Sequence, residues 1–210
     1  MKFRHGLLSL FVLCLVAAPA VAQNDLYDNG PTNGTAFAWT INNNFVESDT
    51  FTLSEASTIN GLNFAAWLTP GDILQSADVS ITSNEFGGTS YFNQTVSFTQ
   101  SGCSLNGSDY FVCNESGTFA GVSLNAGTYW LSLQNAVVPS GDPVYWDENE
   151  GPSSASNNEV GTIPSESFTV LGSVSGTTSS SGTVPEPSSI LLLVSGILGL
   201  CGAVRPKLTP

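Results

Sequence analysis

Basic residues are almost absent from this chain. Its 210 residues include 4 lysines and arginines and 1 histidine, and none of these lies between His5 and Arg205. A Ser-His-Asp triad, a Cys-His pair, a Schiff-base lysine, an arginine clamp and a histidine-bound metal are therefore excluded from this central part. The one catalytic plan left open is a pair of carboxylates, as in glycoside hydrolases.

Acidic residues, in contrast, are plentiful. All of the 17 aspartates and glutamates except Glu186 lie between Gln23 and Thr183, and the formal net charge of the chain is −13. A surface of one sign repels nucleic acid and anionic lipid headgroups, attracts cations and keeps an exported protein soluble. We therefore expect no nucleic-acid partner, and a fold stabilised by apolar burial and hydrogen bonds.

The first residues have the pattern of a secretory signal peptide. Lys2 and Arg4 precede an apolar run over residues 6–16, and the small residues of segment 20–22 provide a cleavage site. The apolar run is too short to span a bilayer. We expect residues 1–22 to be a signal peptide that is removed on export.

Of the 4 cysteines, only Cys103 and Cys113 lie in the central part of the chain. Asn106-Gly107 between them is a hairpin signal, which would place the two cysteines opposite each other on neighbouring strands. An exported protein permits oxidation, so we expect a structural disulfide. The alternative, a reactive or metal-binding pair, lacks a nearby basic group and a histidine.

Residues 36–171 consist of short β-branched and aromatic runs separated by Gly, Asn, Asp, Ser and Pro. Several runs alternate with a period of two, and they are residues 49–54, 77–83, 94–100, 127–134 and 167–172. No segment has the pattern of an amphipathic helix. We predict an all-β protein with about eight to ten strands, forming a single antiparallel β-sandwich of jelly-roll type over residues 23–171. The Gly/Ser/Thr stretch 172–183 is expected to be a linker.

An uncharged apolar run occupies residues 188–204, and Arg205 and Lys207 follow it. As a helix this run would be about 25 Å long, which is slightly short for a bilayer core. The positive-inside rule keeps a basic end such as 205–210 in the cytoplasm and leaves the rest of the chain outside. We predict a transmembrane helix; the alternative is a helix packed in a soluble core.

Four residues lie directly in front of this run, and they are Val184, Pro185, Glu186 and Pro187. The tail therefore consists of this motif, the apolar run and a basic end, in that order. Segment 184–210 resembles the PEP-CTERM sorting signal of Gram-negative bacteria, which membrane enzymes of the exosortase family read. The resemblance implies an exosortase-type partner and transient anchoring in the inner membrane. Tails of this family usually end in a denser arginine cluster than the one here. The body also resembles segments of such sorted proteins, for which no activity is implied.

The densest group of oxygen ligands is "SGDPVYWDENEG", which contains Asp142, Asp147, Glu148 and Glu150. Calcium prefers such carboxylate and carbonyl oxygens, so these four residues are candidates for a structural calcium site, although they lack EF-hand spacing. They are also the candidates for a carboxylate-only glycosidase. The simpler alternative is a solvated acidic loop. We expect no catalytic residues and no cofactor other than this calcium ion.

These observations favour an exported, non-enzymatic protein of the cell surface or exopolysaccharide matrix, held in the inner membrane before processing. The alternative is a calcium-assisted carbohydrate-binding module of that matrix, and a carboxylate-only glycosidase is the third hypothesis. Sugar binding needs exposed aromatic platforms. The candidate aromatic residues are Trp39, Trp67, Tyr91, Trp130, Tyr145 and Trp146.

Overall fold

The structure is a computed structural model that describes residues 23–176, and these residues form strands and no helix. The first six strands are β1 (Asn24–Asp28), β2 (Ala38–Thr40), β3 (Val46–Leu53), β4 (Ser57–Leu68), β5 (Ser76–Asn84) and β6 (Gly87–Leu105). The other six are β7 (Phe111–Leu124), β8 (Gly127–Val137), β9 (Tyr145–Asp147), β10 (Ala155–Asn157), β11 (Gly161–Ile163) and β12 (Phe168–Val174).

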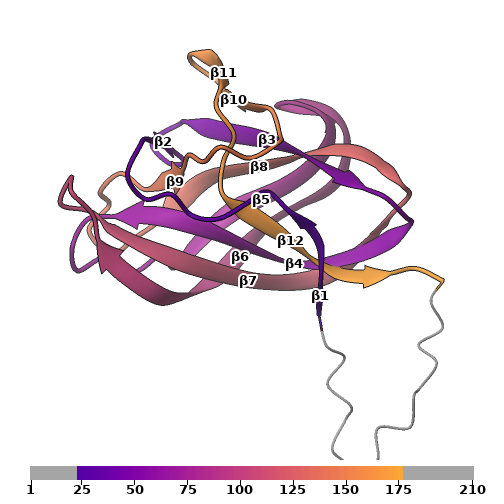
Figure 1. Cartoon of the computed structure of the whole chain (residues 1–210), viewed down its shortest axis with the longest axis horizontal. Helices are drawn as coiled ribbons and strands as arrows, with labels where there is room; N and C mark the ends of the chain where they lie inside the picture. The colour runs from indigo at the N-terminus through magenta and orange to yellow at the C-terminus, as the bar shows by residue number, and fades with distance from the viewer. Residues whose placement is uncertain (1–22, 177–210) are drawn as a thin grey trace, which may run out of the picture.

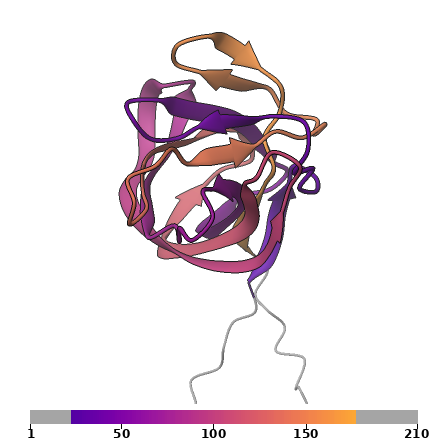
Figure 2. The same ribbon diagram turned by 90° about the vertical axis from the view of Figure 1, so that its left-hand side faces the viewer.

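The strands form one curled antiparallel sheet (Figures 1 and 2). Its strand order is β1-β12-β4-β7-β6-β5-β8-β3-β10-β11, and β9 joins β2 to β4 beside this path. β6 makes the curl possible because it changes partner along its length. Its first part pairs with β5 up to Ser97, and its second part pairs with β7 from Phe98 onward.

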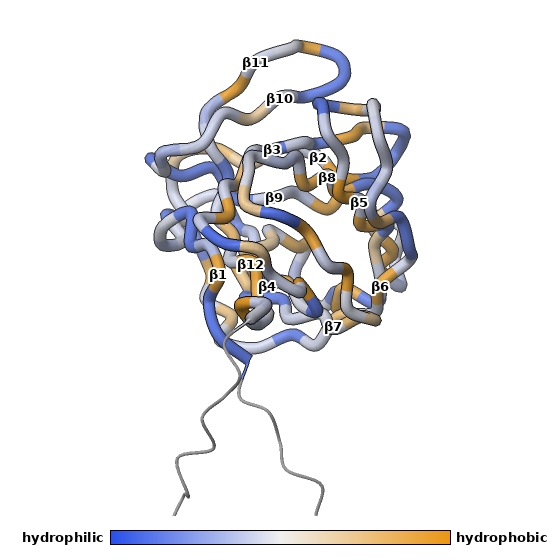
Figure 3. Tube along the Cα trace, turned by 90° about the vertical axis from the view of Figure 1, so that its right-hand side faces the viewer, coloured by the Kyte–Doolittle hydropathy of each residue, from blue (hydrophilic) through white to orange (hydrophobic). Residues whose placement is uncertain are grey.

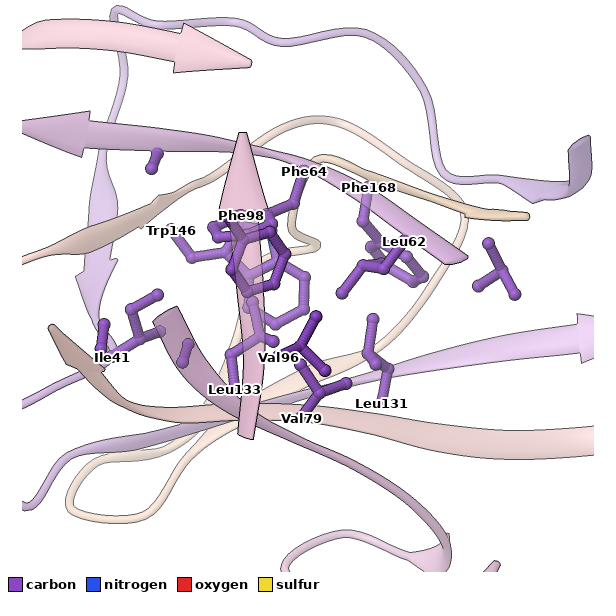
Figure 4. Close-up of a cluster of buried hydrophobic side chains, with 14 of the residues drawn as sticks. Ile41, Leu62, Phe64, Val79, Val96, Phe98, Leu131, Leu133, Trp146 and Phe168 are labelled. Carbon is purple, nitrogen blue, oxygen red and sulfur yellow. The ribbon is translucent and has the colours of Figure 1, made fainter. Parts of the chain in front are cut away.

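Apolar side chains fill the inside of the curled sheet (Figure 4). Trp146 on β9 is fully buried there, and its ring makes edge contacts with Phe64 at 6.0 Å and Phe168 at 5.5 Å between centroids. Hydrophobic and hydrophilic residues alternate along many strands (Figure 3), because successive residues of a strand point to opposite faces. Edge-to-face ring pairs add to the burial of apolar area.

The predicted all-β class is confirmed, and every pairing between the strands of residues 23–176 is antiparallel. All five alternating segments fall in strands, namely β3, β5, β6, β8 and β12. The last strand runs to Val174, so residues 172–174 continue the sheet where composition alone predicted a linker. Val174 pairs with Ser57 of β4, and the partner strand rather than the local composition determines where β12 ends.

The predicted disulfide is confirmed. Cys103 on β6 is bonded to Cys113 on β7, with 4.1 Å between their Cα atoms. The intervening loop closes through Asn106, whose side-chain oxygen accepts hydrogen bonds from the backbone N–H groups of Ser108 (3.0 Å) and Tyr110 (3.0 Å). The positive φ of this loop is at Asp109 (63°), so the hairpin has a longer loop than a two-residue Asn-Gly turn.

The two ends of the described chain leave the fold side by side. β1 pairs with β12, and the paired ends, with Asn24 opposite Gly172, lie at the end of the molecule remote from the β10–β11 hairpin (Figure 1). The predicted signal peptide 1–22, the motif Val184 to Pro187 and the basic Arg205 and Lys207 lie outside the described residues. Within residues 23–176 no helix has the length and hydropathy of a membrane span.

Candidate functional site

Asp147, one of the predicted calcium ligands, has a structural role in the fold. It is fully buried at the end of β9, and its carboxylate accepts three hydrogen bonds. Its Oδ1 accepts the indole N–H of Trp67 (2.6 Å) and the backbone N–H of Gly34 (2.9 Å), and its Oδ2 accepts the backbone N–H of Asn33 (2.8 Å). Burial raises its pKa above the usual value, and these hydrogen bonds oppose that rise.

The other three predicted ligands lie around this residue in different settings. Glu148 is half-buried, and its Oε2 accepts the indole N–H of Trp39 (3.0 Å). The backbone N–H of Asp142 donates to Ser140, while Glu150 is exposed and lines a cavity of about 560 Å³. Among the residues that the structure describes, no three Asp, Glu, His or Cys side chains are grouped as ligands of one metal ion.

A series of cavities runs along the outer face of β4 and β7. The first (about 480 Å³) and the next (about 360 Å³) share Thr32 and Asn114 in their linings. Most of their other lining side chains are small or uncharged polar groups, including Asn63, Ser101 and Asn106. Uncharged amides and hydroxyls of this kind can donate to and accept from the hydroxyls of a neutral ligand.

An aromatic pocket of about 310 Å³ lies near one end of this series. Trp67, Tyr110 and Tyr145 line it, and Phe37 is 66% exposed beside them. The Tyr110 and Tyr145 rings meet edge to face at 5.4 Å between centroids, and Trp67 is tilted by 38° to Tyr110. The pocket is therefore a recessed aromatic corner rather than the coplanar platform of exposed rings that many sugar sites use.

The six aromatic candidates from the sequence separate into different environments, and two of them, Trp39 on β2 and Trp130 on β8, are half-buried. Trp146 belongs to the core, and Trp67 is nearly buried on the outer face of β4. Tyr145 is half-buried in the aromatic pocket, whereas Tyr91 is 41% exposed on β6. Phe37 and Tyr110 complete the pocket and were missed, because neither lies in a strand pattern and only the fold brings them to Trp67.

Four acidic residues that the sequence did not single out are fully buried, and they are Glu47, Asp49, Glu115 and Glu166. Glu47 and Asp49 continue the inward face of β3 that carries Phe51, so they project into the interior. Glu166 lies in the segment leading into β12, and its backbone N–H donates to Asp49 Oδ2 (2.8 Å). The alternating pattern of "VESDTFTL" was the signal that could have identified Glu47 and Asp49 as inward-facing residues.

The environment of these carboxyls favours their neutral form. Burial raises the pKa of Glu47 to about 8, partly opposed by a hydrogen bond from Asn157, and burial raises the pKa of Asp49 to about 6. The pKa of Glu166 is raised strongly, first by burial and then by the charges of Glu47 and Asp49. Glu115 on β7 is a separate case, since burial alone raises its pKa to about 7.

Asn29 joins these carboxyls to the surrounding loops. Its Nδ2 lies within hydrogen-bonding distance of four oxygens: Asp49 Oδ2 (3.3 Å), Ser153 Oγ (2.7 Å), Ser165 Oγ (2.6 Å) and the Glu166 carbonyl (2.6 Å). An amide NH₂ has only two hydrogens, so oxygens outnumber the donors here. We call Asn29, Glu47, Asp49, Ser165 and Glu166 the buried polar cluster.

Comparison of the chain with protein-family models and with curated proteins finds no match.

Proposed function

We propose that this chain is an exported, non-enzymatic protein of the cell surface or extracellular matrix, sorted through its C-terminal segment by an exosortase-type enzyme. The observation that carries the proposal is the order of three parts in residues 184–210: Val-Pro-Glu-Pro, an uncharged apolar run, and the basic Arg205 and Lys207. The signal-peptide pattern of residues 1–22 agrees with the same route.

The fold suits a tethered body. We take the curled antiparallel sheet to be a β-sandwich of jelly-roll type, joined to its tail through the stretch that follows β12. Because β1 and β12 pair at one end, a tail fixed at the membrane leaves the β10–β11 hairpin pointing away from it. Proline restricts its own backbone and that of the preceding residue to extended conformations, a property that suits a segment to be recognised by an integral enzyme.

The sorting proposal is tested by replacing Pro185, Glu186 and Pro187 with alanine in the full-length chain. The parent should be cleaved and leave the inner membrane, whereas the variant should remain there at its unprocessed mass. Replacement of Ser188 and Ser189 by alanine is the matched control, and it should be processed like the parent. A triple variant that is cleaved and released at the parental rate contradicts the proposal.

A second candidate function is binding of a neutral polysaccharide. The observation that favours it is the row of uncharged polar cavities with the Phe37, Tyr110 and Tyr145 pocket near one end. An extended sugar chain presents hydroxyls along its length and apolar ring faces, and this row offers partners for both. The lining contains amides and hydroxyls with few charged groups, so an uncharged glycan matches it better than an anionic one.

Glycan-array binding in the presence and absence of EDTA tests this second function. We expect binding to neutral polysaccharides and a roughly 5- to 30-fold loss of affinity on Phe37→Ala, since an aromatic–sugar contact contributes on the order of 1 to 2 kcal/mol. Ile73→Ala, which removes another exposed apolar side chain (56% exposed), should bind like the parent. An array with no binding under either condition contradicts the function.

A further inference from the structure

Two buried carboxylates in the buried polar cluster have unused oxygens. Glu47 and Glu166 are both 0% exposed. Within the described part of the chain, Glu47 Oε2 and both carboxylate oxygens of Glu166 have no hydrogen-bond partner. The Glu166 backbone N–H donates to Asp49 Oδ2 (2.8 Å), and Glu47 lies two residues before Asp49 on the same inward face of β3, so the free oxygens belong to one region of the interior. Such a group of oxygens is costly to bury without a positive partner.

Residues 23–176 contain no side chain that can supply that partner. No lysine, arginine or histidine lies between His5 and Arg205, so the folded part has no cationic side chain that could form a salt bridge with these carboxylates. A proton neutralises one oxygen of a carboxyl and leaves the other without a partner. A metal ion, in contrast, accepts electron pairs from several oxygens at once. The donor atoms here are all oxygens, which are the ligands of hard cations.

We propose that Glu47 and Glu166 are the carboxylate ligands of a cation site for which Ca²⁺ is the best match. No third acidic side chain joins them as a ligand in residues 23–176, so the other ligands must be neutral oxygens. Three neutral oxygens lie around Asn29 Nδ2, namely Ser153 Oγ, Ser165 Oγ and the Glu166 carbonyl, so this interior contains such groups. Mg²⁺ fits less well because it retains water in strict octahedral geometry.

A cavity lies on the other side of Asn29 from these carboxyls. This residue is fully buried, yet it lines the cavity of about 560 Å³ whose wall also contains Asp28 and Glu150. Two acidic residues in that wall raise the local concentration of cations. Asn29 therefore connects an acidic cavity on one side with the carboxyls of β3 and Glu166 on the other. Glu150, from the predicted acidic loop, lines this cavity and is not one of the proposed ligands.

Calcium titration of the full-length protein, stripped with EDTA and purified in detergent, tests the proposal. Calorimetry should show saturable binding at one site, and the melting temperature should rise by about 5 to 10 °C at free Ca²⁺ a hundredfold above Kd. Mg²⁺ should give a smaller rise. Absence of saturable calcium binding to the parent overturns the proposal.

Two variants locate the effect. Glu47→Gln with Glu166→Gln keeps the shape of both side chains and should abolish the calcium-dependent rise in melting temperature. Glu115→Gln is the matched control, because Glu115 is another fully buried glutamate without hydrogen-bond partners in residues 23–176, and it should retain the rise. If calcium stabilises the double variant as much as the parent, the ion binds elsewhere and the assignment is wrong.

Discussion

Trp67 on β4 donates its indole N–H to Asp147 Oδ1 at the end of β9, over 2.6 Å. The same carboxylate accepts the backbone N–H groups of Asn33 and Gly34, so a single side chain fixes the loop after β1 against the outer face of the sheet. Gly34 packs there with a positive φ of 66°, and a Cβ at that position would lie 3.5 Å from Val112. The loop forms the wall of the cavity series.

Replacement of Asp147 by asparagine should destabilise the protein by about 2 to 4 kcal/mol. The NH₂ group of the new amide would face an N–H group that donates to a carboxylate oxygen in the parent. Urea unfolding followed by tryptophan fluorescence measures the loss. Asp142→Asn changes the charge equally in the same segment and should change the free energy of unfolding by about 0.5 kcal/mol or less. Equal midpoints for the two variants would show that the Asp147 contacts contribute little.

Loss of the Cys103–Cys113 disulfide should also destabilise the fold. The bond closes a short ring with a sequence separation of 10. In the chain-entropy model its removal costs about 2 to 3 kcal/mol. Comparison of the parent with a Cys103→Ser, Cys113→Ser variant by chemical unfolding measures this cost. The reducing agent should lower the stability of the parent to that of the variant and leave the variant unchanged; a parent insensitive to reduction contradicts the prediction.

Glu115 should make stability depend on pH. Its pKa is about 7 in the folded protein and 4.5 ordinarily, so the folded state favours the protonated form. The stability that this form provides is fully present below pH 4.5 and is lost as the pH rises toward 7. Glu115→Gln should therefore match the parent at pH 4 and exceed it by on the order of 2 to 3 kcal/mol at pH 8. Unfolding curves at both values test this; an equal difference at the two pH values argues against a buried, titrating Glu115.

Gly151→Ala should weaken the loops around the buried polar cluster. A Cβ at Gly151 would collide with the backbone carbonyl of Asn29 and approach Ser165 Oγ to 2.6 Å. Because a backbone atom cannot rotate away, we expect a loss of about 1 to 3 kcal/mol. Gly107→Ala is the control, because nothing lies within 4 Å of a Cβ at Gly107 and its φ is not positive. Gly141 is less suitable, because its φ of 78° would strain an alanine. Thermal unfolding of Gly151→Ala and Gly107→Ala compares the two; similar melting temperatures contradict the prediction.

The sequence predicts the strands well where alternation and composition agree. In β8 and in the second half of β3 the inward residues are aromatic or leucine, in β5 they are Ala77, Val79 and Ile81, and the structure buries them. The extent of β12 was underestimated because Gly172 and Ser173 have linker-like composition, and their strand form depends on pairing with β4. Local pattern thus identifies a strand, while its length depends on a partner that is distant in sequence.

The candidate sites were harder to predict. Asp147 and Glu148 lie in an acidic stretch that is typical of solvated loops, yet their oxygens accept hydrogen bonds from Trp67 and Trp39 on other strands. Glu47 continues an inward face that the sequence shows, so its burial could have been inferred from the period alone. Glu166 could not, because it has no local pattern and only the fold places it beside β3.

The position of β12 has a mechanical consequence. This strand is hydrogen-bonded to β1 on one side up to Gly172 and to β4 on the other side up to Val174. A force applied to the chain beyond Ser175 and directed along the strand would load both ladders in shear, with many bonds sharing the strain. A force across the sheet would instead open the ladders one bond after another. The direction in which a tether pulls would therefore decide how much tension this body can resist.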